Sequence, residues 1–242
     1  MRKIRIYEDT DIIANNTIEL GESASNHVAR VLRMQCGEAI YVFNGTGIEA
    51  ECIITQINKK SVICNVKSIE EVKNESPLNI HLGQVLNKGD KMDLIVQKCV
   101  ELGVTEITPL VSQRCNIKLT EDRLLKKQQT LQKIVISACE QCGRAIVPKI
   151  NPIIDIVDFV KEGADELKLT LNPYAKFKIK ELDVKTKNIR LLVGPEGGFN
   201  ETETKMAADN NYTDVLLGPR ILRTETAALV AISIIQSQFG DI

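Results

Sequence analysis

The chain has 242 residues, of which 43% are hydrophobic and 26% are charged, and its formal net charge is −1. This length lies between one large domain and two small ones and allows a substantial core. The N-terminus MRKIRIYEDT lacks the apolar region of a secretory signal, and no stretch approaches the ~18 apolar residues that a membrane helix needs. These features predict a cytoplasmic protein and argue against one that coats nucleic acid without specificity.

The first 73 residues are expected to form a small β-rich barrel or sandwich. Residues 4–7 are predicted to be an edge strand, and Ser25 is expected to cap a helix through Arg33. Three apolar side chains of that helix should share one face, namely Val28, Val31 and Leu32. Three strand-like runs rich in Ile and Val follow, at 39–43, 48–57 and 61–69. The polar stretch 73–77 then has the composition of a linker.

After Pro77 the pattern changes to alternating strands and helices, which predicts a mainly parallel sheet covered by helices. The expected strands are 78–86, 106–111, 166–171, 190–193 and 214–217. The expected helices are 90–102, capped by Asp90, then 120–141, 153–162, one that begins at Asn200, and 224–238. Asn200 and Glu203 have the spacing of a capping box. The sequence therefore predicts an α/β fold for residues 77–242.

The seven cysteines are an odd number scattered through apolar segments, as expected for reduced, buried side chains. Cys139 and Cys142 form a single CxxC. A zinc site needs about four ligands, and the chain offers no second CxxC and only two histidines, His27 and His81. We therefore expect no metal site.

Residues 112–149 are locally basic, with eight cationic and three acidic side chains, a local charge of +5. The cationic residues are Arg114, Lys118, Arg123, Lys126, Lys127, Lys133, Arg144 and Lys149. The acidic residues are Glu121, Asp122 and Glu140. Charge alone does not separate an RNA-binding surface from a solvated helix face.

Two Gly-Pro loops are each expected at the carboxyl end of a parallel strand, where open α/β sheets bind their ligands. They are GPEGG at 194–198 and LGPRILRTETA at 217–227. Glycine lets backbone groups approach a flat ligand closely, so the loops suit a nucleoside read by main-chain hydrogen bonds. Neither loop matches GxGxxG, and the chain has no GxxxxGK[ST]. Simple strand-to-helix turns remain the alternative for either loop.

Together with other blocks, these loops make the chain resemble the bacterial 16S rRNA (uracil-N3)-methyltransferases. The blocks, in order, are HVARVLRM (27–34), SPLNIHLGQVLNKGDKMD (76–93), QKCVELGVTEITPL (97–110), SACEQCGRAIVP (137–148), GPEGG and LGPRILRTETA. The resemblance implies a PUA-like RNA-binding β-barrel at 1–73 and a SPOUT methyltransferase domain at 77–242. It also implies a C-terminal trefoil knot, a homodimer, and S-adenosylmethionine bound in the knot.

Carried over by this resemblance, the cofactor-binding residues would lie in the two loops. They are Leu192, Gly194, Glu196, Gly197, Gly198, Leu217, Gly218, Arg220, Ile221, Leu222, Arg223 and Thr224. Uracil N3 becomes a good nucleophile only as its proton leaves, so Arg220 and Arg223 are candidates to stabilise the negative charge. Glu196 is one candidate base, and Glu140 and Glu225 are others. A role of Glu196 in ordering the loop or contacting the ribose stays open.

The implied partner is 16S rRNA in the 30S ribosomal subunit, with the target uridine unpaired or flipped. The candidate RNA contacts are Arg30, Arg33, Arg114, Arg123, Lys126, Lys127 and Arg144. Two rival functions remain open: a SPOUT enzyme that methylates the ribose 2′-oxygen of tRNA or 23S rRNA, and a non-catalytic RNA-binding assembly factor.

Overall fold

A computed structural model of the chain describes residues 3–87, 90–115 and 120–242, and these form two compact units. The first comprises residues 1–75 with 136–147, and the second comprises 76–135 with 148–242. The sequence-based boundary placed 136–147 in the second domain. In the structure this segment belongs to the first unit and is hydrogen-bonded to it. The segment includes the end of helix α3 (Glu121–Cys142). The Arg5 guanidinium donates to the carbonyl oxygens of Cys139 and Arg144.

The first unit contains a five-stranded sheet with the strand order β1-β3-β4-β5-β2. Its strands are β1 (Arg5–Tyr7), β2 (Thr17–Glu19), β3 (Ala39–Phe43), β4 (Ile48–Ile57) and β5 (Val62–Glu71). β1 runs parallel to β3, and the other pairs are antiparallel. Alternate side chains such as Ile40, Val42 and Ile54 point into one core, as the period of two predicts. β2 was missed because it has a single apolar residue, Ile18, which cannot show that period.

The helix of the first unit differs from the prediction. It starts earlier, as α1 (Glu22–Asn26), and continues as a π-helical turn, His27–Val31. Ser25 does not cap it; its hydroxyl donates to the Leu20 carbonyl and accepts from the Val62 N–H. The wider π turn shifts the faces of the helix, so Val31 and Leu32, predicted to share a face with Val28, are 62% and 38% exposed whereas Val28 is buried.

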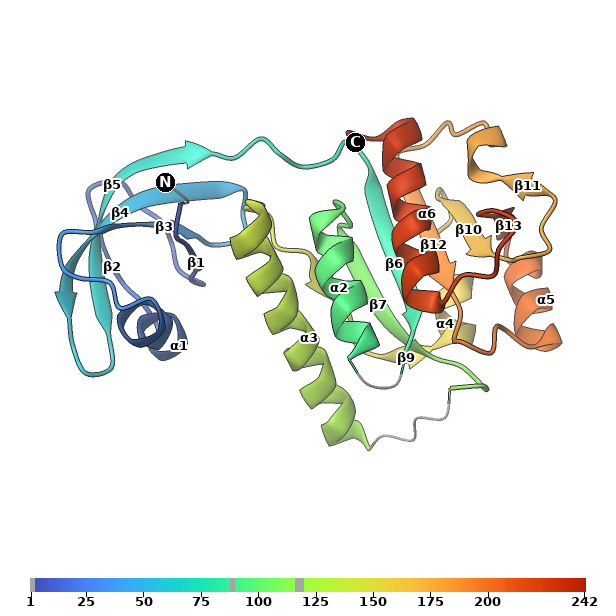
Figure 1. Ribbon diagram of the computed structural model, residues 1–242, viewed down its shortest axis with the longest axis horizontal. Coiled ribbons are helices and arrows are strands. Elements are labelled where there is room, and N and C mark those ends of the chain that lie inside the picture. Colours follow the sequence, from blue (N-terminus) through green and yellow to red (C-terminus); the bar gives the residue numbers. More distant parts are fainter. Residues whose placement is uncertain (1–2, 88–89, 116–119) are drawn as a thin grey trace. The chain divides into compact units, whose positions relative to one another are not determined.

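The second unit is built on a parallel sheet with the order β11-β13-β10-β12-β6-β7-β8, and β9 also pairs with β7 (Figure 1). The strands are β6 (Asn79–Val85), β7 (Glu106–Val111), β8 (Lys149–Ile150), β9 (Ile154–Asp155), β10 (Leu167–Leu171), β11 (Phe177–Lys178), β12 (Asn188–Val193) and β13 (Thr213–Leu216). Every pair in this sheet is parallel, which confirms the predicted topology. The two-residue strands β8, β9 and β11 were too short to predict.

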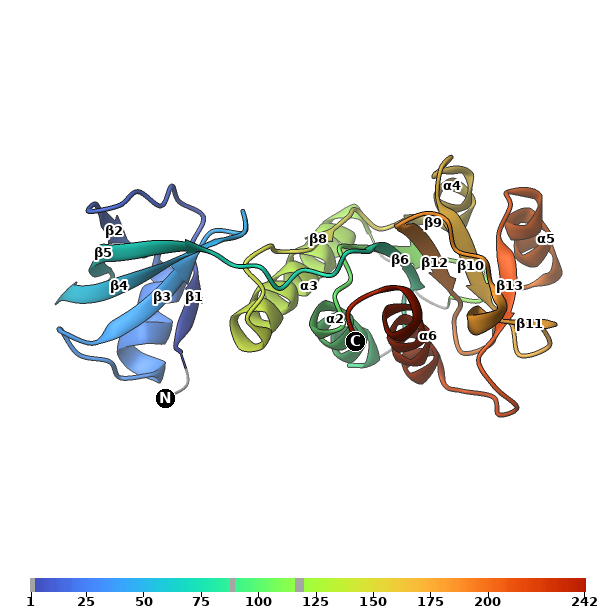
Figure 2. The same cartoon turned by 90° about the horizontal axis from the view of Figure 1, so that it is seen from above.

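Helices cover both faces of this sheet. They are α2 (Lys91–Glu101), α3, α4 (Ile156–Lys161), α5 (Glu201–Asp209) and α6 (Thr224–Phe239). Figure 2 shows α2 and α6 on one face and α4 and α5 on the other. Within the described parts of the chain, none of the helices has both the length and the apolar character required to span a bilayer.

Of the two helix caps predicted in the second unit, the one at Asn200 is confirmed and the one at Asp90 is not. Asn200 and Glu203 form the predicted capping box: the Asn200 side chain accepts from the Glu203 N–H at 2.8 Å, and the Glu203 carboxylate accepts from the Asn200 N–H at 2.9 Å. This box fixes the start of α5 directly after the GPEGG loop. Asp90 does precede α2, but its side chain forms no capping hydrogen bond.

Gly83, in the middle of β6, lets the sheet approach α4 closely. A Cβ at this position would overlap the ring of Phe159, which is fully buried in the core between β6 and α4. We expect Gly83→Ala to lower the free energy of unfolding by about 1–3 kcal/mol, because the ring cannot move away in a close-packed core. Urea denaturation followed by circular dichroism would measure the change.

The double variant Gly83→Ala/Phe159→Leu provides the control, since removing the ring removes the overlap. The loss caused by Gly83→Ala should therefore be smaller in the Phe159→Leu background than in the wild type. An equal loss in both backgrounds would show that steric overlap with Phe159 is not the cause.

Candidate active site

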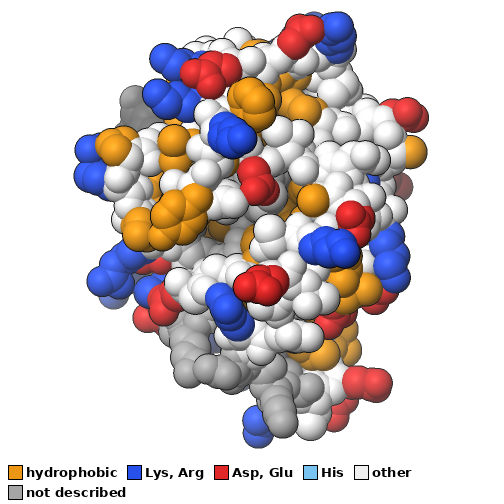
Figure 3. All heavy atoms as spheres, turned by 90° about the vertical axis from the view of Figure 1, so that its right-hand side faces the viewer, with side chains coloured by type: hydrophobic (Ala, Val, Ile, Leu, Met, Phe, Trp, Pro, Cys, Tyr) orange, Lys and Arg blue, Asp and Glu red, His pale blue; other side chains and the backbone are white. Residues whose placement is uncertain are grey.

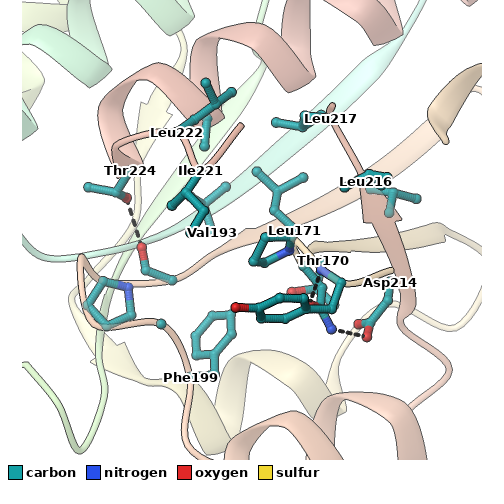
Figure 4. A pocket seen from close by; sticks show the side chains of 18 of the residues that line it. Thr170, Leu171, Val193, Phe199, Asp214, Leu216, Leu217, Ile221, Leu222 and Thr224 are labelled. Carbon is teal, nitrogen blue, oxygen red and sulfur yellow. Dashed lines mark hydrogen bonds between the residues drawn. The ribbon is translucent and has the colours of Figure 1, made fainter. Parts of the chain in front are cut away.

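A cavity of about 700 Å³ lies at the carboxyl ends of β10, β12 and β13 (Figure 4). Three loops line it, following these strands at 170–174, 193–199 and 214–224. In Figure 4, Leu217 and Leu222 lie on one side of the cavity and Phe199 and Asp214 on the other. The site is therefore where open parallel sheets commonly bind ligands.

Thr224 joins two of these loops. Its hydroxyl donates to the Gly194 carbonyl oxygen at 2.8 Å and accepts from the side-chain amide of Gln84 at 3.2 Å. Thr224 follows β13 and Gly194 follows β12, and β10 lies between these strands. The segment 217–223 therefore crosses the end of β10 before α6 begins.

The GPEGG loop depends on its glycines at two positions. Gly198 has a φ of +66°, a conformation that other residues rarely adopt. A Cβ at Gly194 would lie 3.1 Å from the ring of Phe199, so a larger residue would crowd the ring that closes one side of the cavity. Arg114 further fixes the loop by donating to the carbonyl oxygens of Gly197 at 2.6 Å and Phe199 at 3.3 Å.

Two arginines at the cavity are available to a ligand. Arg220 and Arg223 both line it and are exposed. Among the described residues, neither side chain has an ion pair or hydrogen bond. Their charges are therefore not neutralised by neighbouring carboxylates, as suits a site that receives an anionic or polarised group.

The carboxylates near the cavity are differently placed. Glu196 lines it and forms an ion pair with Lys91, the first residue of α2. The Lys91 ammonium also lies 3.8 Å from Glu225 in the first turn of α6. One Glu225 oxygen is buried and has no hydrogen-bond partner in the described chain. Lys91 thus places positive charge between the GPEGG loop and the start of α6.

All predicted cofactor residues line the cavity except Leu192, which is fully buried in the core between the sheet and α4. Sequence reasoning missed the loop at 170–174 together with Phe199 and Asp214. The strand 166–171 was predicted, and the rule that ligands bind at carboxyl ends of parallel strands applies to it equally. That rule would have found the third loop even though it has no Gly-Pro signature.

Glu140, the third candidate base, lies in the first unit and outside the cavity lining. It accepts a hydrogen bond from the Tyr7 N–H at 3.0 Å, and burial raises the pKa of its carboxyl group. Cys139 nearby is also buried, which raises the pKa of its thiol to about 12. Among the described residues, no three His, Cys, Asp or Glu side chains cluster as metal ligands would.

The candidate RNA contacts fall into two groups. Arg30, Arg33, Arg123 and Lys126 are exposed, and Lys127 pairs with Asp93 at 3.0 Å. Arg144 departs from the prediction, because it is only 4% exposed and its guanidinium pairs with Glu75 at 2.5 Å. Its charge therefore stabilises the first unit from within. Lys118 lies outside the described residues.

Comparison with known families defines the class of this protein. A family model described as an RNA methyltransferase domain matches residues 74–236, and one described as an RNA methyltransferase PUA domain matches residues 20–67. With the parallel sheet and the loop cavity, these matches identify an RNA methyltransferase with a PUA domain and a SPOUT-type methyltransferase domain. The predicted α/β fold with these two domains is confirmed, and the C-terminal trefoil knot stays a prediction.

Individual relatives narrow the assignment. Ribosomal RNA small subunit methyltransferase E of Buchnera aphidicola subsp. Schizaphis graminum is 40% identical over 240 residues, which are 98% of this chain and 97% of the relative. The protein of the same name from Bacillus subtilis is 31% identical over 222 residues, 88% of this chain and 87% of the relative. The chain belongs to the ribosomal RNA small subunit methyltransferase E family, as the resemblance predicted.

Two solved structures similar to this chain contain the cofactor. A ribosomal RNA small subunit methyltransferase E from Neisseria gonorrhoeae, bound to S-adenosyl methionine, matches with a TM-score of 0.94 and 37% identity. A protein from Legionella pneumophila in complex with the same cofactor matches with a TM-score of 0.97 and 40% identity. Both alignments cover 100% of each chain.

The cavity of this protein fits S-adenosylmethionine. Its volume lies in the usual range of small-molecule sites, roughly 300–1,000 Å³. Val193, Leu217 and Leu222 offer apolar surface for the adenine ring and methionine carbons. The Thr170 hydroxyl lines the cavity, is buried, and has no hydrogen-bond partner in the described residues, so it is free to bond a polar group of the cofactor.

Thr224 offers a direct test of how the cavity is assembled. Thr224→Val keeps the shape of the side chain but removes the hydrogen bond that joins α6 to Gly194 and the one accepted from Gln84. Because the Gln84 amide still donates to the Val85 carbonyl, the bond to Gly194 is the main loss. Loss of one such bond costs about 1 kcal/mol, so we expect the affinity for S-adenosylmethionine to fall roughly fivefold. Isothermal titration calorimetry would measure this affinity.

Thr226→Val is the matched control, because Thr226 is exposed in the same helical turn. It should leave the affinity unchanged. Equal affinities for Thr224→Val and the wild type would mean that this bond does not hold the cavity together.

Proposed function

We propose that this protein transfers the methyl group of S-adenosylmethionine to N3 of a specific uridine in the 16S rRNA of the small ribosomal subunit. The observation that carries the proposal is the cavity itself. In it, the loops predicted to hold the cofactor meet beside Arg220 and Arg223, two cations without partners in the described chain. Membership of the family described above supports the choice of small-subunit rRNA.

The chemistry requires removal of the N3 proton, because N3 of neutral uracil is a poor nucleophile. The bound cofactor supplies an electrophilic methyl group. Arg220 and Arg223 stabilise the negative charge that develops on the uracil oxygens as the proton leaves. The apolar cavity walls exclude water, which strengthens these charge interactions. The cavity loops position the uracil in line with the methyl group.

Two carboxylates remain as proton acceptors beside the cavity. Glu196 lines it, and Glu225 lies in the first turn of α6, with Lys91 close to both. The ion pair with Lys91 also supports the loop-ordering role of Glu196. The variant Glu196→Gln removes both the proton acceptor and the charge that pairs with Lys91, whereas Lys91→Gln breaks the ion pair and leaves the acceptor. Comparison of the two variants therefore separates the two roles.

The family resemblance supports three further features of the same function. The domain at 1–73 binds the RNA around the target, with Arg30 and Arg33 among its exposed cations. The protein acts in the cytoplasm as a homodimer. Residues 217–239 thread a trefoil knot, and the crossing of 217–223 over the end of β10 is in keeping with such a path.

A methyl-transfer assay tests the reaction and the substrate together. Purified protein is incubated with labelled S-adenosylmethionine and 30S subunits from a strain that lacks this modification, and the nucleosides are then separated. We expect label in 3-methyluridine of 16S rRNA. Label in a 2′-O-methyl nucleoside, or in tRNA or 23S rRNA, would contradict the proposal, and absence of cofactor binding would favour an assembly factor.

Variants of the arginines test their role in the same assay. Arg220→Gln and Arg223→Gln should each lower kcat by about tenfold to a thousandfold, because a donor that stabilises transition-state charge is lost. Lys205→Gln, an exposed cation on α5 outside the cavity lining, should leave kcat unchanged. A decrease of kcat in all three variants would point to general attraction of RNA instead.

A further inference from the structure

An exposed aromatic ring stands at the mouth of the cofactor cavity. Tyr174 lines the cavity and is nevertheless 85% exposed, more than any other large apolar or aromatic side chain in the described chain. A tyrosine ring left in water at the rim of a ligand cavity is available for stacking on a flat group. The roles described above for the two Gly-Pro loops and for Arg220 and Arg223 do not require an exposed ring at this position.

The backbone of Tyr174 is fixed despite this exposure. Its N–H donates to the side-chain oxygen of Asn172 at 2.9 Å, and the Ala175 N–H donates to the Asn172 carbonyl at 3.1 Å. The side-chain amide of Asn172 in turn donates to Asp214 of β13 at 2.7 Å, a bond drawn in Figure 4. The turn is therefore tied to the sheet, and little order is lost when the ring binds a ligand.

The rest of the rim matches a nucleotide. Ile221 is 79% exposed beside Arg220, and Arg223 follows on the same loop. The carboxylates that line the cavity are occupied, Asp214 by Asn172 and Glu196 by Lys91. Figure 3 shows the side of the second unit that faces right in Figure 1, where apolar side chains lie in patches among both basic and acidic ones. Aromatic rings that stack on bases, together with cations that attract the RNA backbone, are the side chains with which proteins hold unpaired RNA.

We propose that Tyr174 stacks on the uracil that receives the methyl group, and that the turn 172–175 with Arg220 and Arg223 forms the binding subsite for this nucleotide. The inference rests on the function proposed above and identifies the residue that holds the target base. Stacking orients the plane of the ring, so it brings N3 toward the cavity while the arginines approach the oxygens at the ring edge.

Burial separates this subsite from the place of the cofactor. Thr170, Val193 and Val215 line the same cavity and are buried, so they form its inner part. Small-molecule sites enclose most of their ligand, roughly 70–90% of its surface. The cofactor therefore belongs in the inner part, and Tyr174, at the outside, faces the side from which RNA arrives.

Kinetics of three variants test the stacking role. Tyr174→Ala should lower kcat/KM for 30S subunits about tenfold, within the range caused by loss of one base–aromatic stack, and leave the affinity for S-adenosylmethionine unchanged. Tyr174→Phe keeps the ring and should retain nearly full kcat/KM. Phe177→Ala is the matched control, because Phe177 is an exposed ring three residues away that does not line the cavity.

Fluorescence gives a readout that does not depend on activity. The chain contains no tryptophan, so Tyr174→Trp carries a single indole at the subsite. We expect its emission to be quenched when a short single-stranded RNA with the sequence around the target uridine is added in the presence of the cofactor. The cofactor alone should change the emission little.

Two outcomes would overturn the inference. Quenching by S-adenosylmethionine alone, with weaker cofactor binding by Tyr174→Ala, would make Tyr174 a cofactor residue. Wild-type kcat/KM in Tyr174→Ala would show that the ring does not hold the base. Failure of the proposed function is distinguishable, because the wild-type protein would then form no 3-methyluridine at all.

Discussion

The hydrogen bonds of Thr224 are the constraint on which the active site depends. A parallel sheet with the order β13-β10-β12-β6 brings the carboxyl ends of its strands to one edge but leaves the loops there independent. Thr224 connects Gln84 of β6 with the segments that follow β12 and β13, and Lys91 adds an ionic link between Glu196 and the start of α6. These links join the loops to one another and so fix the positions of the loops that line the cavity.

The chemistry that the site favours depends on which charged side chains around the cavity have no partner. Carboxylates around the cavity are paired with Lys91 or with an amide, and Arg114 is used to hold the GPEGG loop. Of the exposed cations in the described lining, Arg220 and Arg223 are the two whose side chains have no hydrogen-bond or ion-pair partner. An otherwise apolar cavity with uncompensated cations at its mouth favours a substrate that becomes negative as it reacts.

Much of this arrangement could be predicted from the sequence, and the failures have physical causes. The capping box at Asn200 and the two Gly-Pro loops are local signals, and both were found where expected. The loop after β10 has no such signal, because its role depends on neighbouring strands that are distant in sequence. Arg144 shows the same limit. It lies in a basic segment and was therefore predicted to contact RNA, but its charge is paired with Glu75, which is 69 residues away in the sequence.

The crossing of 217–223 over β10 also has a consequence for biosynthesis. Chains emerge from the ribosome in sequence order, and earlier parts begin to fold first. Every strand of the second sheet precedes Leu217, so the sheet can pair while the segment that completes the cavity is still being made. A chain interrupted before Thr224 would retain strands but lack the bond to Gly194. The chain can therefore bind the methyl donor only late in translation. Incomplete chains would not compete with the finished protein for S-adenosylmethionine.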